Sequence, residues 1–438
     1  MGQESQSKQA IGLQSATSKM PWFHTVVTES GRKHVMFLGH KILSYPTSTV
    51  KKLKEQRKKL KEYSVHLNVV QSIVESQRRD FSFDPAIESY CSDNAFGIGA
   101  APADMLSDIG VVLQNSNLYS SYYYHQISTT GRSIPAFIVI HGLGNTLDSE
   151  IAVNLAKQYN IPLFFNEDGF LRSATVCIRK DKVDPIFTRC LAFNFDPYGP
   201  YYDCSSHSWL EHMLDDPELN LTPEQLTRAR SCMDFLLENY LTKYNHQPIN
   251  DHLLDDIKGP KVLVVDQSYG DQSIYRGGAS DRTFDQMLEL AKQENPNGTI
   301  LVKTHPDAIA SGSKSKAYYG GVKAEGNVRL LTDPINPISL IKQCDRVYVC
   351  TSQFGFEALM CGKDVQIFGR PFYAGYGLGT ARQMIKRQRT RTLEEMFYIA
   401  YIKYVHYLNP FTNQPCSIEE VMECLIKLRE MYQQNHQK

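Results

Sequence analysis

Hydrophobic and polar positions follow three different patterns along this chain. Residues 1–20 are rich in Ser, Gln and Lys and show little periodicity, so we expect them to form a mobile tail. A short apolar run at residues 34–38 predicts a strand, and residues 48–79 have the apolar spacing of a helix. From residue 95 onward, short apolar runs alternate with amphipathic segments, which is typical of α/β proteins.

The first clear unit of this α/β region ends on two carboxylates. Residues 134–141 predict a strand, residues 148–159 a helix and residues 161–166 a second strand. This succession implies a parallel sheet, and ligands gather at the carboxyl ends of such strands. Glu167 and Asp168 follow the second strand and precede a glycine, so we expect a functional site there. A surface turn is the alternative, because Asp-Gly is a favoured turn dipeptide.

A second α/β series begins after residues 245–259, whose Pro, Asn and Asp residues mark a linker. Its predicted strands are residues 261–266, 299–303, 328–331, 346–350 and 365–368, and its predicted helices are residues 281–293, 337–343 and 354–361. Two such series predict an α/β fold of the GT-B-like class, with two Rossmann-type domains facing a cleft. We expect these domains at residues 21–250 and 251–390. Residues 391–438 would pack across them, with helices at 392–408 and 417–433.

Length and charge agree with two domains and exclude some partners. The 438 residues exceed the roughly 250 to 300 at which one hydrophobic core stops growing. Lys and Arg number 47, as do Asp and Glu, and this balance argues against nucleic acid as a partner. Ten scattered cysteines without a C-x-x-C pair indicate reduced thiols in a cytoplasmic protein. The apolar runs are far shorter than the ~20 residues that a membrane helix needs.

Positive charge is concentrated in two segments. From Lys51 to Lys61 the predicted helix carries a dense basic run, which is either a solvated helix face or a contact with phosphates or anionic lipid head groups. The second interpretation would place the protein peripherally at the inner membrane. Another basic stretch runs from Lys386 to Arg391, where an anionic donor or lipid would bind.

Polar residues also follow three strands of the second series. They are Gln267, Gly270, Asp271 and Ser273 after the first, Lys303 and His305 at the second, and Ser352, Gln353 and Glu357 at a helix start after the third. Helix N-termini and cationic side chains attract anions, so convergence of these residues at one sheet edge predicts a phosphate pocket. Taken singly, each is more often a structural histidine, a helix cap or a surface residue.

Five sequence blocks resemble the signature blocks of the bacterial capsule-polysaccharide β-Kdo glycosyltransferases of the KpsC type. They are NEDGFLRS at 166–173, GPYYDCSSHSWLEHML at 199–214, DQSYGDQSIYRGGAS at 266–280, VKTHPDA at 302–308 and the block at 347–378. The resemblance implies a GT-B glycosyltransferase that transfers Kdo from CMP-Kdo, with retention of the β configuration, to a glycan or lipid-linked acceptor in capsule biosynthesis. Larger members carry two such modules, and this chain has length for one.

The resemblance also implies roles for individual residues. It places Gln267, Gly270, Asp271 and Ser273 near the donor, Lys303 and the catalytic His305 at the phosphate, and Ser352, Gln353 and Glu357 at the phosphate and ribose. The first domain would hold the acceptor. Acidic and aromatic residues suit sugar binding, so Tyr201, Tyr202 and Asp203 are candidate contacts, with the edge of the core as the alternative. His141 and Asn145 follow a strand and are also candidate contacts, unless they cap the next helix. No metal is expected, because no D-x-D motif falls at a plausible strand end, and no cofactor is needed besides the CMP-Kdo substrate.

The chemistry of such a donor suits these residue types. Loss of CMP from a ketosidic carbon leaves an oxocarbenium-like centre, which a nearby carboxylate stabilises. Retention most simply takes two displacements, which makes Asp168 the nucleophile and Glu167 the alternative nucleophile or the acid/base partner. Arg172 would orient either carboxylate or bind the Kdo carboxyl group. The other candidate functions are a transferase for another CMP-ulosonic acid or nucleotide sugar, and a non-catalytic glycan-binding protein of capsule assembly.

Overall fold

The structure, a computed structural model, describes most of the chain. The described residues are 23–27, 32–37, 40–80, 82–91, 96–115, 117–120, 134–142, 146–176, 183–304 and 317–436. The chain divides into two compact units, Met1–Gln71 and Ser72–Lys438. The expected tail at residues 1–20, Asn145 and His305 lie outside the described residues, so the expectations for them stay predictions.

The first unit contains a small antiparallel sheet and the beginning of a long helix. The strands, in sheet order, are β1 (Phe23–Val27), β2 (Arg32–Phe37) and β3 (His40–Pro46). The helix is α1 (Thr47–Arg79), whose last turns from Ser72 onward belong to the second unit. The strand predicted at 34–38 and the helix predicted at 48–79 are therefore confirmed. Within the basic run, the side chains of Glu55 and Lys58 are described, and both are exposed.

The second unit contains a seven-stranded sheet that is parallel in one half. Its strands, in sheet order, are β16 (Gln414–Cys416), β15 (Val405–Asn409), β8 (Ala192–Asp196), β7 (Leu163–Asp168), β6 (Phe137–His141), β4 (Gly97–Ala100) and β5 (Leu118–Ser120). From β5 to β7 the pairs are parallel, and α4 (Leu147–Tyr159) connects β6 to β7 as predicted. The strands β8, β15 and β16 extend the sheet in antiparallel fashion.

The helix predicted at residues 392–408 is wrong in its second half. Helix α13 (Leu393–Phe397) leads into a π-helix, η4 (Tyr398–Lys403), and the chain then forms β15. Val405 and Tyr407 pair with Asn194 and Ala192 of β8, which otherwise would be an edge strand with unpaired backbone groups. This pairing across the sheet outweighs the helical spacing of the local sequence.

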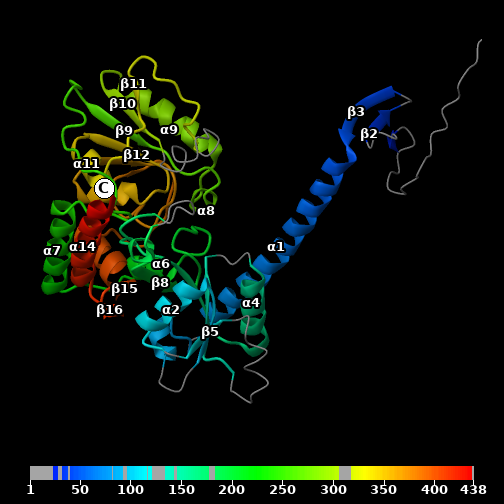
Figure 1. The fold of residues 1–438 in the computed structure, drawn as a ribbon, viewed down its shortest axis with the longest axis horizontal. Helices are drawn as coiled ribbons and strands as arrows, with labels where there is room; N and C mark the ends of the chain where they lie inside the picture. Colours follow the sequence, from blue (N-terminus) through cyan, green and yellow to red (C-terminus); the bar gives the residue numbers. More distant parts are fainter. Residues whose placement is uncertain are drawn as a thin grey trace, which may run out of the picture. The chain divides into compact units, whose positions relative to one another are not determined.

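A six-stranded sheet, parallel throughout, forms the other part of the second unit (Figure 1). Its strands, in sheet order, are β11 (Val328–Leu331), β10 (Thr299–Lys303), β9 (Lys261–Val265), β12 (Arg346–Val349), β13 (Asp364–Ile367) and β14 (Thr380–Ala381). The helices among them include α8 (Gln272–Arg276), α9 (Asp281–Glu294), α11 (Pro337–Lys342) and α12 (Phe354–Met360). The two sheets confirm the predicted α/β, GT-B-like class.

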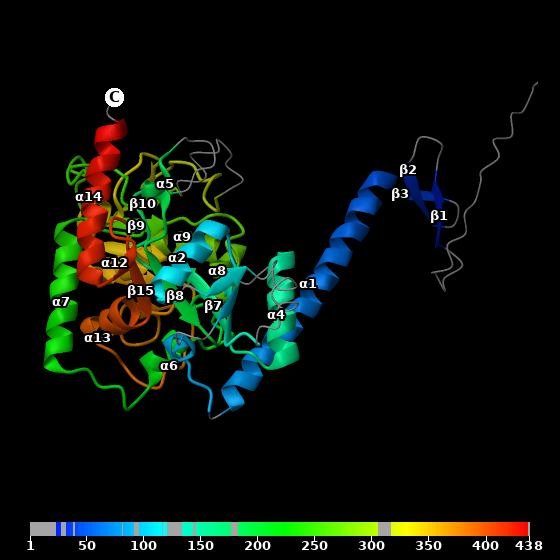
Figure 2. The ribbon, with the colours of Figure 1, turned by 60° about the horizontal axis from the view of Figure 1, so that its bottom comes forward.

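Helices and a shared core connect the two sheets. Helices α7 (Pro223–Glu238) and α14 (Ile418–His436) run side by side in Figures 1 and 2, and Arg228 of α7 lies 2.7 Å from Glu419 of α14. One hydrophobic core contains residues of both sheets. At its centre, the ring of Phe170 lies 4.9 Å from that of Phe372 and 4.7 Å from that of Tyr401, measured between centroids.

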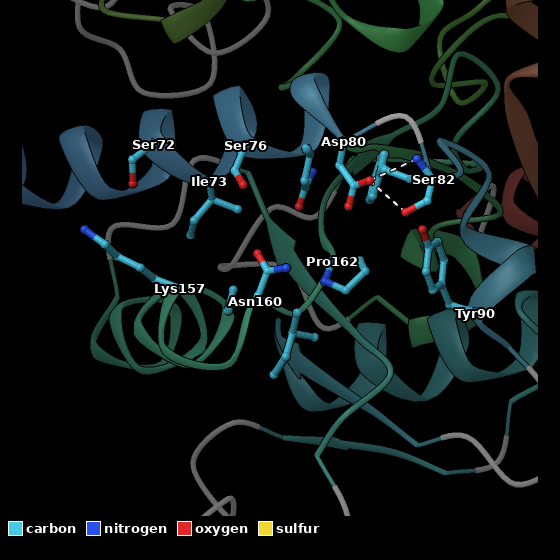
Figure 3. A pocket seen from close by; sticks show the side chains of 13 residues that line it. Ser72, Ile73, Ser76, Asp80, Ser82, Tyr90, Lys157, Asn160 and Pro162 are labelled. Atoms are coloured by element: carbon cyan, nitrogen blue, oxygen red, sulfur yellow. Dashed lines mark hydrogen bonds between the residues drawn. The ribbon is translucent and has the colours of Figure 1, made fainter.

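A buried glutamine fixes the end of α1 to the seven-stranded sheet. Gln77 Nε2 donates to the carbonyl oxygens of Leu163 (3.2 Å) and Pro197 (2.9 Å), and its Oε1 accepts from the Leu163 N–H at 2.7 Å. Beside it, a pocket of about 410 Å³ opens between α1, the 3₁₀-helix η1 (Ile87–Tyr90) and the end of α4. Figure 3 shows Ser76 of α1 and Asn160 after α4 at this pocket. The pocket lies where β7 begins, at the opposite end of that strand from Glu167 and Asp168.

Two side chains at the start of α12 join the two sheets. Gln353 Nε2 donates to the Phe170 carbonyl at 2.9 Å. Glu357 accepts from the Thr242 hydroxyl and, at 3.3 Å, from Gln353. Glu357 is only 3% exposed, and this burial raises the pKa of its carboxyl to about 7. Gln353 and Glu357 are thus engaged with protein groups, and their contact with the donor stays a prediction.

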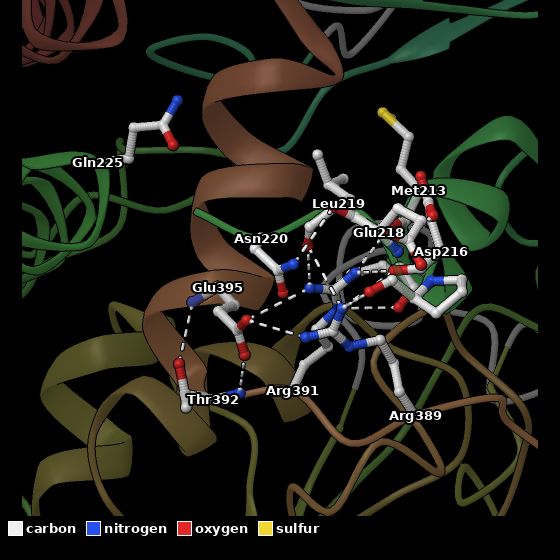
Figure 4. Close-up of polar contacts among 12 residues, drawn as sticks. Met213, Asp216, Glu218, Leu219, Asn220, Gln225, Arg389, Arg391, Thr392 and Glu395 are labelled. Atoms are coloured by element: carbon white, nitrogen blue, oxygen red, sulfur yellow. Dashed lines mark hydrogen bonds and ion pairs between the residues drawn. The ribbon is translucent and has the colours of Figure 1, made fainter. Parts of the chain in front are cut away.

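The basic stretch from Lys386 to Arg391 holds the end of a helix rather than a free anion site (Figure 4). Arg391 is 3% exposed and donates to the carbonyls of Met213, Leu214, Asp216 and Leu219 at 2.8 to 3.1 Å, around the C-terminus of α6 (Trp209–Asp215). Arg389 donates to Asp216, Pro217 and Leu219. The last carbonyl groups of a helix have no partner within it, so these guanidinium groups supply the missing donors.

Replacing Arg391 by lysine tests this contact. Arg391→Lys should lower the free energy of unfolding by about 2–4 kcal/mol, because one ammonium cannot serve four carbonyls and leaves buried acceptors unpaired. Urea unfolding followed by circular dichroism measures the change. Lys386→Gln, at an exposed position of the same stretch, should change stability by less than about 0.5 kcal/mol. Equal stability of Arg391→Lys and wild type would contradict the assigned role.

A second prediction concerns the pH dependence of stability. The pKa of Glu357 rises from 4.5 to about 7 in the folded protein, so the folded state holds a proton that the unfolded chain releases between these values. Its ionised carboxylate therefore costs stability as the pH rises from 4.5 through 7.

Glu357→Gln removes this cost and keeps an oxygen acceptor for Thr242. It should be more stable than wild type at pH 8, by about 1–3 kcal/mol, and the difference should shrink as the pH falls to 5. Glu289→Gln, at an exposed carboxylate of α9, is the matched control. Unfolding curves with the same pH dependence for Glu357→Gln and wild type would refute the assignment.

Candidate active site

Both oxygens of the Asp168 carboxylate are held at the end of β7. Arg172 Nε donates to Oδ2 at 2.6 Å, and the Cys190 thiol donates to Oδ1 at 3.3 Å. Arg172 is itself fixed by a bond from Nη1 to the Thr188 carbonyl at 3.0 Å. Burial opposes ionisation of Asp168, but the positive charges of Arg172 and Lys243 outweigh it and lower its pKa. Asp168 is therefore ionised near neutral pH.

The neighbouring Glu167 has the opposite tendency. Its Oε1 accepts a hydrogen bond from the Tyr202 hydroxyl at 2.6 Å. Burial raises the pKa of Glu167, although Tyr202 and the nearby His141 oppose that shift. Two adjacent carboxyl groups whose pKa values are pushed apart suit two different tasks, one as an ionised nucleophile and the other as a proton carrier.

The predicted donor residues converge in part. Gln267 Nε2 donates to Thr351 Oγ1 at 3.0 Å, and Gln267 Oε1 accepts from the Thr351 N–H at 3.0 Å. The Ser273 hydroxyl lies 3.5 Å from Thr351 Oγ1. The ends of β9 and β12 and the start of α8 thus meet, as the parallel topology predicts. Thr351 was not among the predicted site residues. Its position just after a strand of the parallel sheet is the feature of the sequence that could have identified it as a member of this group.

Between Gln267 and Ser273 the chain makes a tight turn. Gly270 has φ of +81°, a conformation that favours glycine, and a side chain there would meet no atom within 4 Å. Asp271 accepts from the Ser273 N–H at 2.8 Å and so caps α8. The loop therefore presents backbone with open space beside it, next to Thr351.

Two other predicted phosphate contacts are occupied by protein groups. Lys303 is 7% exposed, and its ammonium donates to the Asp333 carbonyl at 3.0 Å. Asp333 follows β11, which lies on the other side of β10 from β12 and Thr351. Burial lowers the pKa of Lys303 to about 8. Ser352 Oγ accepts from the N–H of Phe354, the first residue of α12, at 3.2 Å, so its hydroxyl group is engaged by the backbone next to the N-cap residue Gln353.

The predicted acceptor residues bridge the carboxylates and the donor loop. Tyr202 binds Glu167, while Asp203 pairs with Arg276 of α8, whose carbonyl also accepts from the Cys204 N–H at 2.9 Å. Burial raises the pKa of the adjacent Tyr201 to about 12, and this phenol also feels the charges of Lys243, Glu167, Asp168 and Asp271. His141 Nδ1 lies 3.2 Å from Asn166 Oδ1. Tyr202 and Asp203, adjacent in the chain, therefore join the Glu167 carboxyl group to Arg276 of α8.

Lys243 is a member of this site that sequence reasoning does not find. It lies in the loop after α7, outside any strand end or quoted motif, yet its carbonyl accepts from the N–H groups of Arg172 and Ser173, both at 3.2 Å. Burial opposes the positive charge of Lys243. The pKa of its ammonium is nevertheless raised, because electrostatic interactions with Tyr201, Tyr244, Asp168 and Glu167 outweigh the effect of burial. A permanent ammonium therefore belongs to the carboxylate site.

The described ranges offer neither a metal cluster nor a membrane-spanning helix. There, no group of three or more His, Cys, Asp or Glu residues is arranged to hold a metal ion. None of the helices described has the length and apolarity to cross a membrane.

Comparison with known proteins adds the family. Residues 237–411 match the family of capsule polysaccharide biosynthesis proteins. The chain is 38% identical over 284 residues to the capsule polysaccharide modification protein LipA of Neisseria meningitidis serogroup B, which covers 63% of this chain and 39% of LipA. It is 34% identical over 276 residues to the lipopolysaccharide-processing protein LpsZ of Rhizobium meliloti, covering 63% of this chain and 61% of LpsZ. The chain thus spans well under half the length of LipA.

Two solved structures share this fold. The KpsC beta Kdo 2,4 transferase of Thermosulfurimonas dismutans is 32% identical, with a TM-score of 0.64, over 76% of this chain and 98% of that one. The KpsC beta Kdo 2,7 transferase of the same organism is 24% identical, with a TM-score of 0.55, over 76% of this chain and 99% of that one. On its sequence blocks and its relatives together, the chain belongs to the KpsC-type family of capsule polysaccharide biosynthesis proteins.

Proposed function

We propose that this protein is a retaining glycosyltransferase that moves Kdo from CMP-Kdo to a glycan or lipid-linked acceptor of capsule biosynthesis. The observation that carries the proposal is the pair of carboxyl groups at the end of β7. Asp168 is held ionised by Arg172, and Glu167 beside it has a raised pKa. The resemblance to a KpsC transferase along nearly the whole length of that solved chain supports the choice of donor.

In the first step of this mechanism, an oxygen of Asp168 attacks the anomeric carbon of Kdo. The bond from that carbon to the phosphate oxygen breaks, and CMP departs with the electron pair, leaving Kdo esterified to Asp168. Oδ1 is the better nucleophile, because a thiol is a weaker hydrogen-bond donor than the guanidinium that holds Oδ2. Arg172 keeps the carboxylate oriented throughout.

In the second step, an acceptor hydroxyl attacks the same carbon from the face that CMP left. Glu167 takes the proton of that hydroxyl, and the bond to Asp168 breaks with return of its electron pair. Two inversions give net retention. The Tyr202 hydroxyl, bound to Glu167 at 2.6 Å, fixes the direction of the carboxyl group.

The donor loop around Gly270 supplies the place for CMP. Thr351 and Ser273 offer hydroxyl groups there, and the Gly270 turn offers backbone that a ligand can approach closely. His305 at the phosphate belongs to the same proposal, whereas Lys303 already binds the Asp333 carbonyl. A transferase of the same fold with another CMP-ulosonic acid or nucleotide sugar is the second candidate, and comparison of donor turnover separates the two. A non-catalytic glycan-binding protein would show no turnover of any donor.

Trapping the covalent adduct tests the mechanism. Wild type, Asp168→Asn and Glu167→Gln are incubated with CMP-Kdo and analysed by intact-protein mass spectrometry and for transfer. Glu167→Gln should accumulate a Kdo adduct, since the base of the second step is missing, and Asp168→Asn should form none and lose activity by a factor of about 10³ or more.

The exposed Asp104 of α2 (Ala103–Val112) provides the control, because Asp104→Asn makes the same chemical change away from the site. It should behave as wild type. Full transfer by Asp168→Asn would remove Asp168 as the nucleophile.

We further propose that the basic run from Lys51 to Lys61 on α1 docks the protein on anionic lipid, where lipid-linked acceptors lie. Replacing its lysines by glutamine should abolish co-sedimentation with vesicles that contain anionic phospholipid, and wild-type binding should weaken as salt rises. Vesicles of phosphatidylcholine alone are the control. Binding that ignores both salt and the substitutions would refute the proposal.

A further inference from the structure

Main-chain contacts place Lys243 beside the turn that follows Asp168. Its carbonyl accepts from the N–H groups of Arg172 and Ser173, and the next residue, Tyr244, pairs with Ser173 as an isolated parallel bridge. These contacts do not involve the lysine side chain. The backbone of the loop is thus fixed to the catalytic turn whatever the ammonium does.

The loop is also rigid on its other side. Asn245 is fully buried, and its Nδ2 donates to the carbonyls of Ser173 (3.0 Å) and Thr242 (2.9 Å) while its Oδ1 accepts from the Thr242 N–H at 2.9 Å. The Thr242 hydroxyl binds Glu357 of α12. The backbone on both sides of Lys243 is therefore held in place.

The ammonium faces acidic groups but is bonded to none of the described residues. Glu167, Asp168, Glu357, Tyr201 and Tyr244 act on it electrostatically, and Nζ lies 6.0 Å from the centroid of the Tyr244 ring. Across the described part of the chain, Nζ makes no hydrogen bond or ion pair, so its three N–H donors remain available. Arg172 differs, because its guanidinium already serves Asp168, Ser173 and Thr188.

A donor of the ulosonic acid class creates a need for such a group. Its carboxylate is attached to the anomeric carbon, so an attack by Asp168 brings two negative carboxylates close together. Repulsion between like charges in a buried site opposes that approach unless a cation lies between or beside them. Arg172 is committed to Asp168, which leaves Lys243 as the available cation among the described residues at this end of β7.

We propose that Lys243 binds the carboxylate of the donor sugar and so selects an ulosonic acid over sugars that lack this group. The inference rests on the proposed function and deepens it. Contact with the Kdo carboxylate was one of the two roles expected for Arg172, and the inference assigns this contact to Lys243 instead. Arg172 then acts only in orienting the nucleophile.

Steady-state kinetics of Lys243→Gln and Lys243→Arg with CMP-Kdo test the assignment, with the inhibition constant of CMP measured for each variant. CMP lacks the sugar carboxylate. Lys243→Gln should therefore raise the KM for CMP-Kdo by roughly 10- to 100-fold while the Ki of CMP changes less than about twofold. Lys243→Arg should recover much of the loss because it keeps the charge, and Lys292→Gln on the surface of α9 is the control.

Three results would overturn the assignment. An unchanged KM would show that the carboxylate binds elsewhere, and a parallel rise in the Ki of CMP would show a general defect of the donor site. A lower kcat with a shifted pH profile and an unchanged KM would show that Lys243 only keeps Asp168 ionised. If wild type binds CMP but does not turn over CMP-Kdo, the proposed function itself fails and the inference fails with it, an outcome distinct from the other three.

Discussion

The bond between Gln353 and the main-chain carbonyl of Phe170 is the constraint on which the site depends. Phe170 lies two residues after Asp168, and Gln353 lies two residues after Thr351. This hydrogen bond therefore couples the carboxylate end of β7 to the residues that follow β12, alongside the Asp203–Arg276 pair and the Thr242–Glu357 bond. The Phe170 ring packs against Phe372 and Tyr401 in the core that both sheets share.

Charge arrangement then decides what each carboxyl group can do. A unit charge at about 4 Å is worth roughly 4 kcal/mol at the effective dielectric constant of a partly buried site, which corresponds to about three pKa units. Asp168 has Arg172 at 2.6 Å, so this attraction exceeds the cost of burial and the group stays ionised. Glu167 has a neutral phenol as its nearest partner, so burial prevails and its pKa rises. One strand end thus carries an ionised carboxylate beside a carboxyl group whose pKa is raised.

Much of this could be predicted from the sequence, because local patterns determine the relevant features. Five strands of the six-stranded sheet and three helices among them agree with their predicted bounds to within a residue, whereas β14 and α8 were not predicted. Glu167 and Asp168 lie at a strand end as expected. β15 could not be predicted, since its stability comes from pairing with β8, more than two hundred residues earlier in the chain. Lys243 was hidden for a similar reason: only the backbone bonds to Arg172 and Ser173 bring its loop to the site.

The roles of polar residues were harder to predict than their positions. The sequence placed Gln353, Glu357 and Lys303 correctly at helix starts or strand ends, but the structure gives each a protein partner that no local pattern shows. The basic stretch from Lys386 to Arg391 shows the same limit, because Arg389 and Arg391 serve carbonyls at the end of α6 and in the residues that follow it. Charge in a sequence predicts attraction to a negative group, and only the fold shows whether that group is a ligand or the protein itself.

The most direct test of the central claim is the NMR structure of the product formed from CMP-Kdo and a small panel of synthetic glycan acceptors. It reports the donor, the acceptor and the anomeric outcome in one measurement. The account predicts transfer of a Kdo residue in the β configuration, with release of CMP. A Kdo product in the α configuration would contradict double displacement at Asp168, and the absence of any Kdo product would contradict the proposed donor.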